Sequence, residues 1–211
     1  MTTSCTKPLL RGWLHQVAFV VAIPALVVLV VVARTTQARI AAIVYGIGVC
    51  ALYGVSSSYH RFRWSPAVRA RMKRADHGTI YVMIAATYTP VCLLVLHGAL
   101  GTTLLVAAWA GAFTGLLLSI FGVAKRFAFA LYLMLGWLAV LALPQIASRL
   151  GALDASLLIA GGVVYTIGSL VLATNWPDPF PKVFGYHEVW HTMVVAASVL
   201  HYVLIWRIVG P

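Results

Sequence analysis

The chain has 211 residues, of which 62% are hydrophobic and only 9% are charged. Soluble domains average roughly 45–50% apolar and about 25% charged residues, and a chain this short cannot bury so large an apolar surplus in one water-exposed globule. The composition therefore argues against a soluble enzyme, a disordered chain and a nucleic-acid-binding domain, even though the net charge is +11. It predicts an integral membrane protein, which we expect in the cell membrane.

Seven apolar runs are long enough for a helix of about 20 residues to cross a bilayer. The predicted spans are residues 13–33, 40–60, 77–97, 100–121, 127–147, 155–174 and 186–208. The first run follows Lys7 and Arg11, as a signal peptide would, but it exceeds the roughly 7–15 apolar residues of a signal core, so we expect it to be retained. The chain shows no linker or internal repeat. We therefore expect an all-α, seven-helix bundle forming a single membrane domain over residues 1–211.

The distribution of Lys and Arg predicts the orientation of this bundle. With the N-terminus in the cytosol, the segments inside the cell hold eleven of the 15 cations and the segments outside hold four. An excess of cations on the cytosolic side is the common arrangement, so the sequence predicts a cytosolic N-terminus and a C-terminus outside. Six cations lie within residues 61–74, which we expect to be a cytosolic loop close to anionic lipid headgroups.

Ionisable side chains inside a membrane are costly and are candidates for function by default. Most of those in this chain fall near the cytosolic ends of the predicted spans. They are His15 in span 1, His60 in span 2, Asp76 and His77 in span 3, and His187, Glu188 and His191 in span 7. His97 and His201 fall toward the opposite face, where we expect them to lie at the membrane interface.

The spacing of the histidines predicts a metal site. His187 and His191 are four residues apart, so both imidazoles project from one face of a helix and can bind one cation. His60 is the natural third ligand, which leaves a fourth position for water, as in catalytic zinc sites. Cys5, Cys50 and Cys92 form neither a disulfide framework nor a CxxC metal motif. Zinc is therefore the expected cofactor.

Other polar residues at the same depth have candidate roles around this ion. Ser56 precedes His60 by one helical turn and could hydrogen-bond the bound water or the substrate. Asp76 could accept a proton from a zinc-bound water or orient an imidazole. His77 points about 100° away from Asp76 on a helix, and we expect it to be a structural hydrogen-bonding partner. His15 is either a support on the first helix or a member of the site.

Residues 187–191 also match the H-E-x-x-H pattern, in which the glutamate is the general base of zinc proteases. On this alternative, Glu188 would be the base of an intramembrane metalloprotease. Glu188 also has a structural interpretation, because a carboxylate in the first turn of a helix interacts favourably with the helix dipole.

Four separated motifs stand in order along the chain. They are RGWLH at 11–15, SSSYH at 56–60, RADHGTIY at 74–81 continuing to TYTP at 87–90, and FGYHEVWH at 184–191. Together they resemble the hemolysin III family, the bacterial branch of the progestin and adiponectin receptor superfamily, over almost the whole chain. One departure is Ala86, where a glycine is expected.

The resemblance implies a seven-helix bundle with a zinc ion held on the cytosolic side by three histidines. These correspond to His60, His187 and His191, and Ser56 and Asp76 match the associated serine and aspartate. Eukaryotic relatives are linked to the hydrolysis of ceramide, a lipid amide, and the superfamily is regarded as one of metal-dependent hydrolases. The family name refers to haemolytic activity, which the sequence neither supports nor excludes.

The sequence leaves several functions open. The first is a zinc-dependent hydrolase of lipid amide or ester bonds at the cytosolic side of the membrane. The alternatives are a membrane sensor or receptor with a structural zinc, a pore-forming, haemolysin-like protein, and the H-E-x-x-H protease. Membrane lipids are the expected partners, and neither a nucleic acid nor a protein partner is expected.

Overall fold

The computed structural model describes residues 7–122 and 125–210, and every regular element in this part of the chain is a helix. The α-helices are α1 (Trp13–Val32), α2 (Thr36–Arg61), α3 (Pro66–Leu94), α4 (Ala99–Phe121), α5 (Lys125–Trp137), α6 (Leu143–Leu150), α7 (Ala152–Thr174) and α8 (Tyr186–Val209). A short 3-10 helix, η1 (Leu138–Ala142), joins α5 to α6.

The described residues contain seven helical stretches long and apolar enough to cross a membrane, which confirms the predicted number. The fifth of them, Phe129–Leu150, combines most of α5 with η1 and α6. Most ends agree with the predicted spans to within a few residues. The multi-pass, all-helical character of the protein thus follows directly from its hydropathy.

The third span is the main correction to the predicted boundaries. Helix α3 begins at Pro66, eleven residues before the predicted start at 77, and residues 61–74 are therefore mostly helix and not a loop. Hydropathy marks only the apolar part of a helix, whereas α3 continues into a cationic first part. Pro66 occupies the first turn, where its missing N–H costs nothing. His97, predicted inside this span, lies beyond the end of α3 and is exposed.

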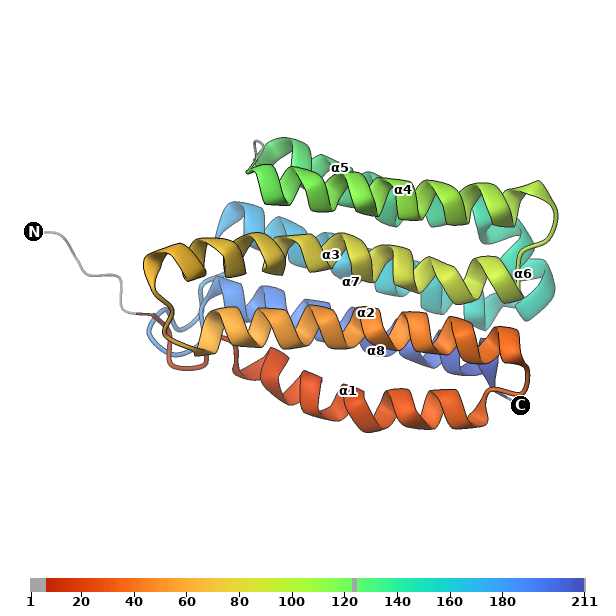
Figure 1. The fold of residues 1–211 in the computed structure, drawn as a ribbon, viewed down its shortest axis with the longest axis horizontal. Coiled ribbons are helices and arrows are strands. Elements are labelled where there is room, and N and C mark those ends of the chain that lie inside the picture. Colours follow the sequence, from red (N-terminus) through yellow and green to blue (C-terminus); the bar gives the residue numbers. More distant parts are fainter. Residues whose placement is uncertain (1–6, 123–124, 211) are drawn as a thin grey trace, which may run out of the picture.

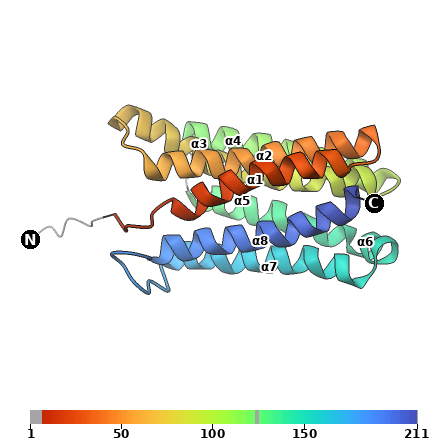
Figure 2. The same ribbon diagram turned by 90° about the horizontal axis from the view of Figure 1, so that it is seen from below.

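The helices form a bundle whose neighbours in the chain pack against one another. Helix α8 returns to contact α1, α2 and α3, so the last helix closes the bundle beside the first three (Figures 1 and 2). Helix α1 begins and helix α8 ends at opposite ends of the bundle (Figure 1), as an odd number of crossings requires.

Small residues allow α2 to approach α3 closely. A β-carbon on Gly48 would lie 2.5 Å from that of Ala86, so the methyl group of Ala86 fills the space that a side chain on residue 48 would need. Small residues at helix contacts are typical of membrane bundles, where close packing replaces the hydrophobic effect. The unexpected alanine is thus accommodated by a glycine opposite it.

Candidate metal centre

The three histidines predicted as metal ligands come together, and the helices that carry them meet at the end of the bundle from which α1 starts (Figure 1). His60 is in the last turn of α2, and His187 and His191 are in the first two turns of α8. These two helices pack against each other, which brings residues 127 or more positions apart into contact.

The imidazoles are close enough to share one ion. The Nε2 atoms of His60 and His187 are 3.2 Å apart, and one ring nitrogen from each of the three residues lies within 4.8 Å of the others. Ligands about 2.0–2.1 Å from a tetrahedral zinc are about 3.4 Å apart, so the His60–His187 pair already has this spacing. The buried Nδ1 of His191 has no hydrogen-bond partner. The trio thus has unused binding capacity and fits a metal ion.

Asp76 and Ser56 lie beside the trio. An oxygen of the Asp76 carboxylate is 3.7 Å from Nε2 of His60, and the Ser56 side chain hydrogen-bonds that carboxylate. Among the described residues, the group that could hold a metal contains the three histidines and not Asp76. The carboxylate is therefore placed next to the candidate ligands rather than among them.

His15 packs directly on the trio. Its ring stacks on His191, with centroids 3.7 Å apart and planes 13° from parallel, and its other neighbour is Tyr53 at 5.1 Å. His15 is 2% exposed, so it is a buried part of the site and not an interfacial residue. His15 therefore lies against a candidate ligand, and the choice between its two predicted roles, a support on the first helix or a member of the site, stays a prediction.

The segment before α1 is folded against the site because of one glycine. Gly12 has φ +84°, a left-handed conformation that other residues adopt only at a cost, and a β-carbon there would lie 2.7 Å from that of His60. Leu9 and Leu10 donate backbone hydrogen bonds to the carbonyl groups of Lys182 and Val183 in the loop before α8. Residues 9–12 are thereby held across the ends of α2 and α8.

This docking places two cations beside the histidines. Arg11 forms an ion pair with Glu188, whose side chain is fully buried, and Lys7 donates a hydrogen bond to the backbone carbonyl of His60. Partial burial, followed by repulsion from Arg69, Arg11 and Arg61, lowers the pKa of the Lys7 amine. The rim of the site is therefore strongly cationic.

Two carboxylates fix the N-terminus of α8. Asp178 accepts a hydrogen bond from the backbone N–H of Tyr186 at 2.8 Å, and Glu188 accepts one from that of Gly185 at 2.9 Å. Free N–H groups in the first turn of a helix need such partners. Since Glu188 gives one oxygen to this N–H and the other to Arg11, the structural interpretation of Glu188 accounts for the whole side chain.

A cavity of about 190 Å³ runs from the histidines into the bundle. Ser56, Asp76, His15, His187 and His191 line one end of it, and most of the remaining lining is apolar. The cavity joins the candidate metal centre to the hydrocarbon-like interior of the bundle.

The other histidines have different outcomes. His77 is exposed and lines the cavity, and its predicted structural hydrogen bond stays a prediction. His97 is exposed at the far end, and its predicted position at the membrane interface stays a prediction. His201 was expected at the interface, which is wrong: it is 7% exposed and lies inside the bundle, because α8 is enclosed by α1, α2, α3 and α7.

The sequence did not reveal the roles of Arg11, Lys7 and Asp178. Their charges were visible, but Arg11 and Lys7 reach their partners only because the residues before α1 dock on the loop before α8, and Asp178 reaches the N–H of Tyr186 only through the fold of that loop. The sequence held one signal of the pairing with Arg11: Glu188 is an acid within a predicted span, and a buried acid requires a cation nearby. Cys50 and Cys92 are free, as expected, and Cys5 lies outside the described residues.

Comparison with known proteins identifies the family. The profile described as "Haemolysin-III related" matches residues 3–202, which is nearly the whole chain. The chain belongs to the haemolysin III family. It is 34% identical to Hemolysin-3 of Bacillus cereus over 97% of this chain and 95% of that protein, and 33% identical to the Hemolysin-3 homolog of Bacillus subtilis over 87% and 85%.

The similarity extends beyond bacteria. The human Monocyte to macrophage differentiation factor is 29% identical over 80% of this chain and 70% of its own length. The family match and this relative support the resemblance to hemolysin III proteins and to their receptor superfamily. All four motifs lie within the matched residues 3–202.

Proposed function

We propose that this haemolysin III protein is a zinc-dependent hydrolase of lipid amide or ester bonds. The observation that carries the proposal is the convergence of His60, His187 and His191 beside Asp76 at the end of an apolar cavity. A site of this composition combines a place for a metal, a proton acceptor and room for an acyl chain. The net cationic end of the bundle supports a position on the cytosolic side of the cell membrane.

The three histidines would hold the metal through ring nitrogens. A zinc ion bound there supplies Lewis acidity and lowers the pKa of a bound water to about 7. The candidate group offers three protein ligands, and three protein ligands are typical of catalytic zinc sites, whereas structural sites have four.

The protein's own groups account for the proton transfers. The Asp76 carboxylate takes a proton from water as the water oxygen attacks the carbonyl carbon. When the C–N or C–O bond of the substrate breaks, the same carboxyl group returns the proton to the leaving nitrogen or oxygen. Ser56, hydrogen-bonded to Asp76, keeps the carboxylate directed at the site. Water is consumed, and an acid and an amine or alcohol are released.

The cavity supports a lipid as the substrate. An acyl chain in this cavity would leave the bilayer without entering water, and its carbonyl end would reach the histidines. Fully buried methylene groups each contribute about 0.8 kcal/mol relative to water, so the lining discriminates against small soluble amides, which lack that contribution.

The protease alternative has less support. Both carboxylate oxygens of Glu188 already take part in hydrogen bonds, one with Arg11 and the other with the N–H of Gly185, and Glu188 is not among the described residues that line the cavity. A water-filled pore is also unsupported, because the cavity is mainly apolar. A sensor with a structural zinc would need a fourth protein ligand, and the trio is the only candidate group found among the described residues.

The test is the hydrolysis of a panel of lipid amides and esters by purified protein loaded with zinc. Asp76→Asn keeps the size of the side chain but removes the base, so kcat should fall by about 10²–10⁴-fold while bound zinc is retained. His97→Ala, a histidine at the far end of the bundle, is the matched control and should keep full activity. Loss of activity in Glu188→Gln with a fully active Asp76→Asn would instead support the protease, provided that Glu188→Gln remains folded.

A further inference from the structure

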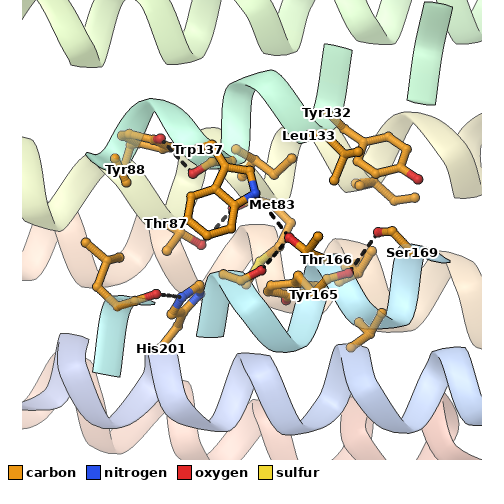
Figure 3. A pocket seen from close by; sticks show the side chains of 18 of the residues that line it. Met83, Thr87, Tyr88, Tyr132, Leu133, Trp137, Tyr165, Thr166, Ser169 and His201 are labelled. Carbon is orange, nitrogen blue, oxygen red and sulfur yellow. Dashed lines mark hydrogen bonds between the residues drawn. The ribbon is translucent and has the colours of Figure 1, made fainter. Parts of the chain in front are cut away.

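The cavity does not end as a purely hydrocarbon-lined space. At the distance of several helical turns from the histidines, it is lined by a second group of polar side chains from four different helices. This distal polar group consists of Thr87 on α3, Trp137 on α5, Tyr165 and Thr166 on α7, and His201 on α8. Figure 3 shows these side chains around the same cavity.

The hydroxyl groups of the distal polar group have binding capacity left. Thr87 donates to the carbonyl of Met83 at 2.9 Å, and Thr166 donates to that of Gly162 at 2.8 Å while accepting from the Trp137 indole at 3.1 Å. A hydroxyl oxygen has two lone pairs in addition to its one proton. Both threonines can therefore accept a hydrogen bond from a ligand without giving up the bonds that they already make.

His201 is the most unusual member. It is an ionisable side chain inside a membrane span, and its Nε2 has only a long contact of 3.4 Å with the carbonyl oxygen of Leu158. Its ring packs against Gly161, where a β-carbon would overlap it, so the sequence keeps space for this imidazole. Buried polar groups of this kind within a membrane are functional candidates, and the metal centre does not use this one.

Helix geometry gives the distance from the candidate metal centre. On α8, His201 follows His191 by ten residues, and on α3, Thr87 follows Asp76 by eleven. At 1.5 Å per residue, both helices put the distal polar group about 15 Å from the trio. An extended residue spans up to about 3.6 Å over its three backbone bonds, which is about 1.2 Å per bond. An extended acyl chain advances by a similar length per carbon–carbon bond. A separation of about 15 Å therefore corresponds to about twelve bonds of an acyl chain.

We propose that the distal polar group binds an oxygen function, a hydroxyl above all, about twelve carbons along an acyl chain whose carbonyl end lies at the trio. The preferred ligands would then be lipids with a hydroxylated long chain. This inference deepens the proposed function and rests on it for the direction in which the chain enters. The distal polar group contains hydroxyl, indole and imidazole groups but no carboxylate, lysine or arginine, so a neutral hydroxyl matches it better than a charged group does.

Equilibrium binding tests this without any turnover. The zinc-supplemented, full-length protein in detergent is titrated by calorimetry with octadecanoic acid and with its 2-hydroxy and 12-hydroxy derivatives. The 12-hydroxy acid should bind about five-fold more tightly than the other two, the effect of one net hydrogen bond. Equal affinities for the three acids, or no binding of any of them, would overturn the proposal.

Isosteric variants locate the effect. Thr87→Val and Thr166→Val each remove one hydroxyl at nearly constant volume, and each should reduce the preference to about two-fold or less. Thr114→Val is the matched control, because Thr114 makes the same type of bond to a backbone carbonyl, at 2.9 Å, but is exposed on α4. A preference that survives in both cavity variants would contradict the assignment.

The two proposals can fail separately. If the protein prefers the 12-hydroxy acid but hydrolyses no lipid amide or ester, the distal subsite is supported and the proposed hydrolase function is contradicted. If the protein hydrolyses these lipids but shows no preference for the position of the hydroxyl, either in binding or in kcat/KM, the hydrolase function is supported and the distal subsite is contradicted.

Discussion

The ion pair between Arg11 and Glu188 shows how single residues hold the candidate metal centre in place. Glu188 is fully buried one residue after His187, and Arg11 lies four residues before His15. A buried carboxylate without a cation would be very costly. The pair therefore joins the segment before α1 to the helix that carries two of the three histidines.

Removing the cation should destabilise the protein. In Arg11→Met, the Glu188 carboxylate stays buried without its partner, and we expect the free energy of unfolding to fall by about 3 kcal/mol, the low end of the range for broken buried pairs because Arg11 is 19% exposed. Adding Glu188→Gln should recover most of this loss. Thermal unfolding in detergent measures both, with Arg34→Met, an exposed arginine at the other end, as the control. If Arg11→Met unfolds at the same temperature as the original protein, the ion pair contributes nothing to stability.

At the residue scale, the sequence was informative wherever chemistry follows from local spacing. The separation of His187 and His191 by one turn predicted their shared face, and the depth of His60 and Asp76 predicted their proximity. His201 was misjudged because its burial depends on neighbours from other helices, which the spacing along α8 does not reveal. The pairing of Arg11 with Glu188 was missed for the same reason, since it depends on a long-range docking of the chain.

At the scale of the elements, the apolar runs predicted seven crossings but not the true length of each helix. Helix α3 extends to Pro66 because its cationic first part is helical outside the apolar run. The fifth crossing is broken by η1 between Trp137 and Leu143, where the chain changes to a tighter helix before Pro144. The cationic part of α3 lies outside the apolar run, and η1 leaves its own run apolar, so the hydropathy of the spans revealed neither feature.

The start of α8 provides a test at this scale. Asp178 caps the helix through the N–H of Tyr186, next to His187. We expect Asp178→Ala to lower the free energy of unfolding by about 1 kcal/mol, as for the loss of other helix caps, and to weaken zinc binding, since the first turn of α8 loosens. Asp178→Asn should behave like the original protein, because asparagine is an equally good cap. Chemical denaturation and zinc titration measure the two effects. Equal stability and zinc affinity in the alanine variant would exclude a role for the cap.

At the scale of the whole molecule, charge and chemistry are concentrated at one end. The cations of residues 61–74 and the docked segment with Lys7 and Arg11 lie at the end of the bundle that holds the histidines. The opposite end holds the partly exposed Arg207, which pairs with the buried Asp154 to join α7 and α8. This asymmetry is the basis for placing the metal centre at the cytosolic side.

The orientation can be measured directly. A reporter enzyme that is active only outside the cytosol should be active when fused after Pro211 and inactive when fused before Met1, because the bundle has an odd number of crossings and its cationic end stays inside. Reporters in the loops between α1 and α2 and between α2 and α3 provide the internal control, and they should give opposite results. Reporter activity at the N-terminal fusion alone would show that the bundle has the opposite orientation.

The most direct test of the central claim is the metal content of the purified protein. We expect about one zinc per chain, a loss of that zinc in His60→Ala and in His191→Ala, and full retention in His97→Ala, whose ring is exposed at the far end. Elemental analysis after removal of loosely bound ions gives the answer. A protein that binds no metal, or one that keeps its zinc when His60 or His191 is replaced, would contradict the account.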